Sequence, residues 1–154
     1  MDRKIEYKRI IFVDENGTCR APMAAEILRD CMPEFPIEIL SRGLIVLFPE
    51  PINQKAEAVM ISNGLHLTGY QTAGLQESDL DETTLVICFE DVQKERIRAI
   101  LPPTFPDEQI QVLHEIVGDE LEIMNPYGAP LPSYGLLYES LNKSITKLAE
   151  LMED

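Results

Sequence analysis

The chain has 154 residues, of which 45% are hydrophobic, and we expect one domain over residues 1–154 with a sizeable core. The formal net charge of −14 argues against binding to nucleic acid or to anionic membranes. No apolar run approaches the roughly 20 residues of a membrane span, and the first residues lack an apolar segment like a signal peptide. We therefore expect a cytoplasmic protein.

Three cysteines are present, and their number and scattered spacing fit neither a disulfide framework nor a zinc site. Cys19, Cys31 and Cys88 are expected to be buried free thiols, with a Cys19–Cys31 redox pair as the alternative. The two histidines, His66 and His114, lie far apart and show no partner pattern. The sequence therefore predicts neither a metal site nor a cofactor.

A strand and a helix are predicted first. Residues 8–13 contain a continuous apolar run, which is typical of a buried parallel strand. After a short polar loop we expect a helix from about Pro22 to Cys31, because a proline is tolerated in the first turn of a helix. Residues 37–41 alternate between polar and apolar and predict the second strand.

The middle of the chain contains one ambiguous segment. Residues 44–48 are strongly apolar and form either a third strand or a hydrophobic loop that faces a binding site or a partner. A second helix is expected over residues 52–60, followed by a capping Asn-Gly pair at 63–64.

The second half continues the alternation of strands and helices. Residues 83–89 are β-branched and apolar and predict a central strand. Residues 90–100 predict a helix that ends at two prolines, and residues 109–113 predict a short strand. A loop rich in glycine and proline then leads to a long C-terminal helix, whose apolar stripe runs from Leu131 to Met152.

This order predicts the α/β fold class. Repeated strand–helix units form a parallel sheet, here of four strands, with right-handed crossovers and helices on both faces, which is a three-layer α/β/α sandwich. Ligands of such folds bind at the carboxyl ends of the strands. The loop at residues 14–20, which directly follows the first strand, should therefore lie at the functional edge.

The same loop has the features of an anion site. It joins a strand to a helix N-terminus, where backbone N–H groups and the helix dipole favour negative charge. Arg20, at the end of the loop, can offer a planar bidentate fork to a phosphate. A structural salt bridge with Asp14 is the alternative role for Arg20.

Residues 14–24 resemble the phosphate-binding loop of the low-molecular-weight protein tyrosine phosphatases, whose signature is Val-Cys-(five residues)-Arg-Ser-Pro-Met-Ala. The residues in family places, including the second loop cysteine, are Cys19, Arg20, Pro22, Met23 and Ala24. Residues 41–43 (Ser-Arg-Gly) match the start of a loop beside the family's active site, and residues 125–128 (Asn-Pro-Tyr-Gly) match its general-acid segment. The resemblance implies the family's fold over nearly the whole chain and favours the loop interpretation of residues 44–48.

Two positions of the resemblance lack the family's reactive groups. Asp14 stands at the position of the nucleophilic cysteine, Asn125 at that of the general acid, and Ala21 replaces the serine after the arginine. Phosphatases of this type attack phosphorus with a low-pKa thiolate and protonate the leaving group, and general acid catalysis alone contributes roughly 10²–10⁴-fold. An amide cannot supply that proton near neutral pH.

Asp14 would also oppose phosphate binding. Two like charges at ~4 Å and an effective dielectric constant of ~20 repel by about 4 kcal/mol, and a phosphate dianion would feel roughly twice that. We therefore predict that Asp14 is an internal anion plug, which accepts N–H bonds from the loop, pairs with Arg20 and has a depressed pKa.

The resemblance implies a ligand-binding cleft between residues 14–20, 42–48 and 125–127. The expected ligand-binding residues are Glu15, Asn16, Gly17, Thr18, Cys19, Arg42 and Tyr127. Packing is the alternative role for Tyr127, and Tyr134 and Tyr138 are expected in the core or on the surface of the last helix. Thr18 matches the residue that the family's protein-arginine phosphatases carry at this loop position.

We predict a catalytically inactive homologue that acts as a binding or regulatory module, with a protein partner or a small ligand in the cleft. The alternative is an active phosphatase of phosphotyrosine or phosphoarginine with altered chemistry, such as an aspartyl nucleophile, or an active-site variant of such an enzyme. The sequence predicts no oligomeric state.

Overall fold

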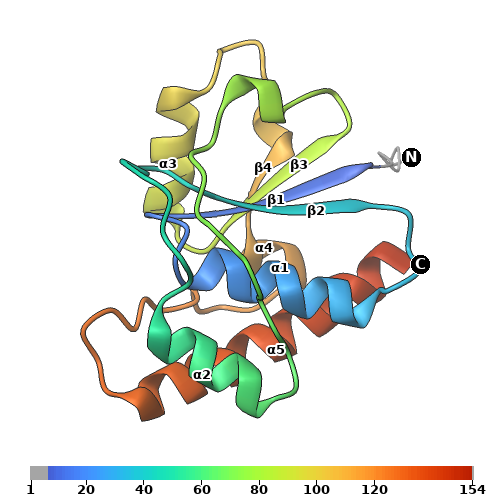
Figure 1. Cartoon of the computed structure of the whole chain (residues 1–154). Coiled ribbons are helices and arrows are strands. Elements are labelled where there is room, and N and C mark those ends of the chain that lie inside the picture. Colours follow the sequence, from blue (N-terminus) through green and yellow to red (C-terminus); the bar gives the residue numbers. More distant parts are fainter. Residues whose placement is uncertain (1–6, 154) are drawn as a thin grey trace.

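The computed structural model describes residues 7–153 and has a four-stranded parallel sheet at its centre (Figure 1). The strands are β1 (Arg9–Asp14), β2 (Glu38–Gly43), β3 (Thr84–Cys88) and β4 (Ile110–Val112), in the order β2-β1-β3-β4. Each neighbouring pair is parallel. The central strands β1 and β3 are almost entirely buried, which explains their continuous apolar sequences.

Helices cover both faces of the sheet, so the predicted three-layer α/β fold is confirmed (Figure 1). The helices are α1 (Arg20–Cys31), α2 (Gln54–Ser62), α3 (Asp91–Ile100), α4 (Leu113–Val117) and α5 (Leu131–Glu153). In Figure 1, α1, α2 and α5 lie below the sheet and α3 lies above it. Two 3₁₀ turns, Glu77–Asp79 and Asp107–Gln109, lie in the connections before β3 and β4.

The alternation of side chains along β1 divides the core into two clusters. Ile10 and Phe12 belong to the cluster that includes buried residues of α1 and α5. Ile11 and Val13 belong to the opposite cluster, which includes Ile97 of α3. Because both faces of β1 are fully covered, the loop at its carboxyl end starts from a rigid base.

The predicted strands and helices are present, with ends that differ by a few residues. Residues 44–48 form no strand, which agrees with the loop interpretation. Helix α4 was not predicted, because its five residues are too short to reveal an apolar period before Gly118 ends it in a left-handed conformation. Within residues 7–153, no helix combines the length and the apolar character that crossing a bilayer requires.

Gly43 allows the loop at 14–20 to pack against the end of β2. A Cβ atom at this position would lie 2.5 Å from the carbonyl carbon of Asn16 and 2.8 Å from the nitrogen of Gly17. Both neighbours are backbone atoms, so neither can turn away as a flexible side chain would. The approach of the two segments therefore requires glycine.

We expect Gly43→Ala to lower the free energy of unfolding by about 1–3 kcal/mol, because the loop must shift to accept the methyl group. Urea denaturation measures the change. Gly135→Ala in α5 is the matched control, since a Cβ there meets nothing, and it should raise the free energy of unfolding by ~0.5–1 kcal/mol. Unchanged stability of Gly43→Ala would contradict this packing.

Candidate functional site

The loop at residues 14–20 lies at the carboxyl edge of the sheet, between the end of β1 and the start of α1. Four of its carbonyl groups accept hydrogen bonds from other segments. The donors are the N–H groups of Leu44 to Asp14 (2.9 Å), Ile45 to Glu15 (2.9 Å) and Asn53 to Thr18 (2.8 Å), and the hydroxyl of Tyr70 to Gly17 (2.7 Å). These bonds satisfy the loop carbonyls through neighbouring segments, while the N–H of Gly17 bonds to the side chain of Asp14.

The carboxyl group of Asp14 occupies this centre. One oxygen accepts the N–H of Ala21, in the first turn of α1, at 2.8 Å, and the other accepts the N–H of Gly17. Asp14 is only 3% exposed. One donor lies in the middle of the loop and the other in the first turn of α1, so the carboxyl group bridges the cradle in which an external anion would bind.

The predicted direction of the Asp14 pKa is wrong. Burial is the largest effect and raises the pKa of Asp14, and it outweighs the lowering effects of the N–H donors of Ala21 and Gly17 and of the charge of Arg20. The sequence suggested that loop N–H groups would donate to Asp14, but the depth at which Asp14 is buried depends on how the sheet and the helices pack around it.

The predicted Asp14–Arg20 ion pair also needs correction. The guanidinium of Arg20 pairs with Glu90, whose carboxylate lies 2.8 Å away, and donates a hydrogen bond to the carbonyl of Ile123 at 2.7 Å. Its carbon atom Cζ lies 5.6 Å from the centre of the Phe89 ring. Glu90 and Phe89 follow β3, at the same edge of the sheet as the loop, and thereby compensate a cation that is only 1% exposed.

A small cavity of about 220 Å³ opens beside the loop. Its lining includes six expected site residues besides Asp14 and Arg20: Glu15, Asn16, Thr18, Cys19, Asn125 and Tyr127. Sequence reasoning missed Asn53, which caps α2, and did not expect Tyr134 here, although both line the cavity. Tyr134 lies on the predicted apolar stripe, so its stripe position predicted its burial but not its place beside the loop.

Arg42 does not line this cavity, contrary to prediction. Its guanidinium forms hydrogen bonds with the Asp79 carboxylate, 3.1 Å from Nε and 3.3 Å from Nη2, and with the carbonyl of Ser41 at 2.8 Å. Asp79 lies in the 3₁₀ turn before β3, far from Arg42 in sequence. The resemblance matched the segment at 41–43 correctly as a neighbour of the loop, since Gly43 contacts Gly17, but not the direction of the Arg42 side chain.

The polar loop residues are engaged with one another or with nearby helices. Asn16 accepts hydrogen bonds at its side-chain oxygen from the hydroxyl (2.6 Å) and the N–H (3.2 Å) of Thr18. Glu15 forms an ion pair with Arg96 of α3. Burial, followed by the charge of Asp14, raises the pKa of the Cys19 thiol to about 12. Cys19 is therefore a protonated thiol near neutral pH.

A comparison of the sequence with known protein families identifies the family of this chain. The family described as "Low molecular weight phosphotyrosine protein phosphatase" matches residues 9–154, which include every strand and helix described above. The chain belongs to the low-molecular-weight phosphatase family.

The relatives of this chain include proteins named as arginine phosphatases and proteins named as tyrosine phosphatases. The chain is 26% identical over 146 residues to a protein-arginine-phosphatase of Geobacillus stearothermophilus, covering 94% of this chain and 96% of that protein. It is 28% identical over 144 residues to the low molecular weight protein-tyrosine-phosphatase PtpB of Staphylococcus aureus, covering 94% and 99%. The crystal structure of the low molecular weight protein tyrosine phosphatase from T. tengcongensis superposes with a TM-score of 0.86 and 29% identity, covering 93% and 98%.

One group of side chains in residues 7–153 of this family member could hold a metal ion. The ligand atoms of Asp91, His114 and Glu122 lie within 4.8 Å of one another. Existing contacts account for this cluster, since Nε2 of His114 lies 3.4 Å from the Asp91 carboxylate, and the carboxylate of Glu122 accepts the Asp91 N–H. None of the three lines the cavity beside the loop.

The raised pKa of Asp14 predicts how its contribution to stability varies with pH. A group that binds its proton more tightly in the folded chain stabilises the fold below its unfolded pKa, about 4 for aspartate, and loses this contribution as the pH rises through the folded value. We compare the chain with Asp14→Asn, which cannot titrate. The unfolding free energy of the natural chain minus that of Asp14→Asn should fall from pH 4 to pH 8.

Urea denaturation across this pH range measures the difference. Taking the difference removes the contributions of other carboxyl groups, such as Asp119, whose pKa is lowered chiefly by its hydrogen bond with Lys147. A difference that rises with pH would mean that the Asp14 pKa is depressed, as the sequence-based hypothesis held.

Proposed function

We propose that this member of the low-molecular-weight phosphatase family has lost phosphatase chemistry and acts as a binding or regulatory module. The observation that carries the proposal is the Asp14 carboxyl group, whose oxygens accept the N–H groups of Gly17 and Ala21 at the centre of the loop. A substrate phosphate would have to displace this side chain before it could reach those donors. A covalently attached acceptor at this position has an entropic advantage over any diffusing anion.

Neither Asp14 nor Cys19 is a suitable nucleophile in this loop. Asp14 stands where the family signature has its reactive cysteine, and both of its oxygens are already hydrogen bonded within the loop. Cys19 lines the same cavity, but a thiol whose pKa is raised to about 12 contains almost no thiolate near neutral pH. Cys19 is therefore not expected to replace the missing cysteine as the nucleophile that attacks phosphorus.

The position that corresponds to the general acid supports the same conclusion. Asn125 lines the cavity beside the loop, as the family resemblance implies for this position. Its side-chain oxygen accepts the N–H of Tyr127 at 3.1 Å, and its amide cannot protonate a leaving group. Loss of a nucleophile and of an acid at two separate segments agrees better with the loss of one reaction than with a change in its substrate.

The cleft retains features of a binding site without its chemistry. Tyr127 is 83% exposed at its border, while the N–H groups of Gly17 and Ala21 are already bound by Asp14 and are not open to an anion. A neutral or cationic ligand, or a protein partner, therefore suits this cleft better than an anion. We further propose that the protein acts in the cytoplasm.

The proposal predicts no hydrolysis of p-nitrophenyl phosphate or of phosphoarginine above background by the natural chain. The double substitution Asp14→Cys/Asn125→Asp restores the family's nucleophile and acid and should raise the rate by about 100-fold or more, since the acid alone contributes roughly 10²–10⁴-fold. Release of p-nitrophenol and of inorganic phosphate measures the two reactions.

The control is Asp14→Ala/Asn125→Asp, which restores the acid, opens the cradle and supplies no nucleophile; it should remain inactive. Thermal unfolding of each variant shows that it is folded before its rate is compared. Turnover by the natural chain that disappears in Asp14→Asn would contradict the proposal and support an aspartyl nucleophile.

A further inference from the structure

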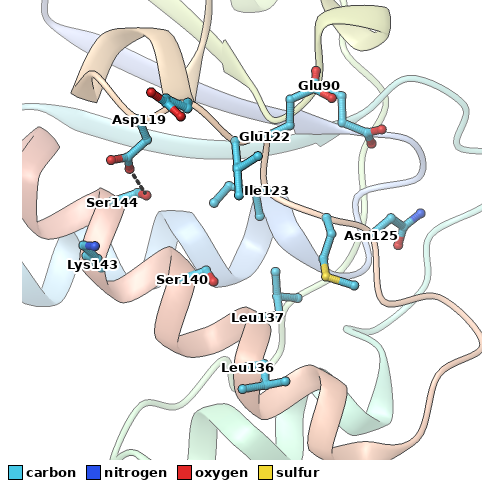
Figure 2. Close-up of a pocket in the computed structure, with 13 residues that line it drawn as sticks. Glu90, Asp119, Glu122, Ile123, Asn125, Leu136, Leu137, Ser140, Lys143 and Ser144 are labelled. Carbon is cyan, nitrogen blue, oxygen red and sulfur yellow. Dashed lines mark hydrogen bonds between the residues drawn. The ribbon is translucent and has the colours of Figure 1, made fainter.

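A larger groove lies outside the loop cleft. It has a volume of about 870 Å³ and runs between residues 119–125 and the exposed side of α5 (Figure 2). Asn125 lines both the groove and the cavity beside the loop, so the two are neighbours at one end. The segment after α4 and residues 136–144 of α5 supply most of its lining.

The groove exposes large apolar side chains from both of its sides. Leu121 is 81% exposed and Met124 is 65% exposed on one side, and Leu136 of α5 is 64% exposed on the other. Ile123 and Leu137 are buried at the base of the groove. Exposed apolar side chains that gather around one hollow and are bordered by polar residues mark a binding surface, whereas scattered ones do not.

The border of this hollow is acidic. Its acidic residues are Glu90, Asp119, Glu120 and Glu122, against a single basic residue, Lys143. In Figure 2 the labelled Asp119, Glu122 and Glu90 lie along the edge opposite the leucines of α5.

Two of these acidic groups are already neutralised by partners. Glu90 pairs with Arg20, and Asp119 pairs with Lys147 at 3.1 Å. Among the residues that the structure describes, Glu120 and Glu122 belong to no ion pair, and both are exposed. Glu122 also accepts the N–H of Asp91, but a neutral N–H leaves its charge in place, so both carboxylates remain available to a partner that brings cations.

Charge decides which occupant suits the groove. A second copy of this chain would bring a net charge of −14 to an acidic border, and nucleic acid would bring a line of phosphates. Both would be repelled. A positively charged peptide segment would be attracted, and its apolar side chains would cover the leucines and the methionine.

We propose that this groove binds a basic segment of a partner protein that carries at least one large apolar side chain. The apolar side chain packs between Leu121, Met124 and Leu136, and lysine or arginine side chains pair with Glu120 and Glu122. The inference goes beyond the proposed loss of catalysis, because it concerns a surface outside the loop cleft and its test measures binding rather than turnover.

Fluorescence anisotropy tests the proposal with the full chain and a short labelled peptide of alternating lysine and leucine. We expect saturable binding that weakens as salt is added. Peptides in which serine replaces leucine, or glutamate replaces lysine, should bind at least about tenfold more weakly, because each lacks one half of the recognition. Amide shifts in NMR spectra should locate the peptide at residues 119–125 and along α5.

Matched variants separate the groove from the net charge. Glu120→Lys/Glu122→Lys should weaken binding at least about tenfold, whereas Glu57→Lys/Glu77→Lys, two exposed acids outside the groove, changes the net charge equally and should weaken it less than about twofold. Leu121→Ser should weaken binding, and Leu151→Ser, an exposed leucine elsewhere on α5, should not. All six substituted positions are exposed, so the four variants are expected to fold.

Three results would overturn the proposal. Equal weakening by the two double lysine variants would show that the peptide responds only to net charge. Absence of binding at about millimolar peptide would show that the groove has no such partner chemistry. Self-association of the chain in sedimentation, lost in Leu121→Ser, would assign the groove to a second copy.

Discussion

The bonds from the N–H groups of Gly17 and Ala21 to the buried carboxyl group of Asp14 are the constraint on which the site depends. A strand–loop–helix junction of this kind directs amide donors inward, and buried donors need acceptors. The chain supplies that acceptor from within, at the first residue of the loop. This acceptor is buried, and burial raises the pKa of Asp14. The two N–H donors and the charge of Arg20 lower that pKa, but they offset the effect of burial only in part.

The surrounding contacts follow from this arrangement. Arg20 is held by the carboxylate of Glu90 and by the carbonyl of Ile123 at the same edge of the sheet. We propose that the family fold is kept here as a scaffold whose anion site is filled by its own side chain. We propose that binding instead involves the groove beside the loop, where acidic and apolar side chains are exposed.

The sequence predicted the fold well, because alternating apolar strands and amphipathic helices depend on local patterns and the family signature lies in consecutive residues. It predicted less of the site. The partner of Arg20 is 70 positions away at Glu90, and no local pattern links the two. The directions of Arg42, which turns to Asp79, and of the Asp14 pKa depend on burial and on side-chain contacts formed only in the folded chain. The groove beside α5 was not predicted. It combines residues 119–125 with one side of α5, and the apolar stripe of α5 indicates only which of its residues are buried.

The central claim is that the Asp14 side chain excludes phosphate from the loop. An NMR titration with inorganic phosphate, which follows the backbone amide signals of Gly17 and Ala21, tests this claim without any assumption about catalysis. The account predicts that these signals do not move in the natural chain at phosphate concentrations up to about 10 mM, and that they shift and saturate in Asp14→Cys, which opens the cradle. Saturable shifts of both signals in the natural chain would contradict it.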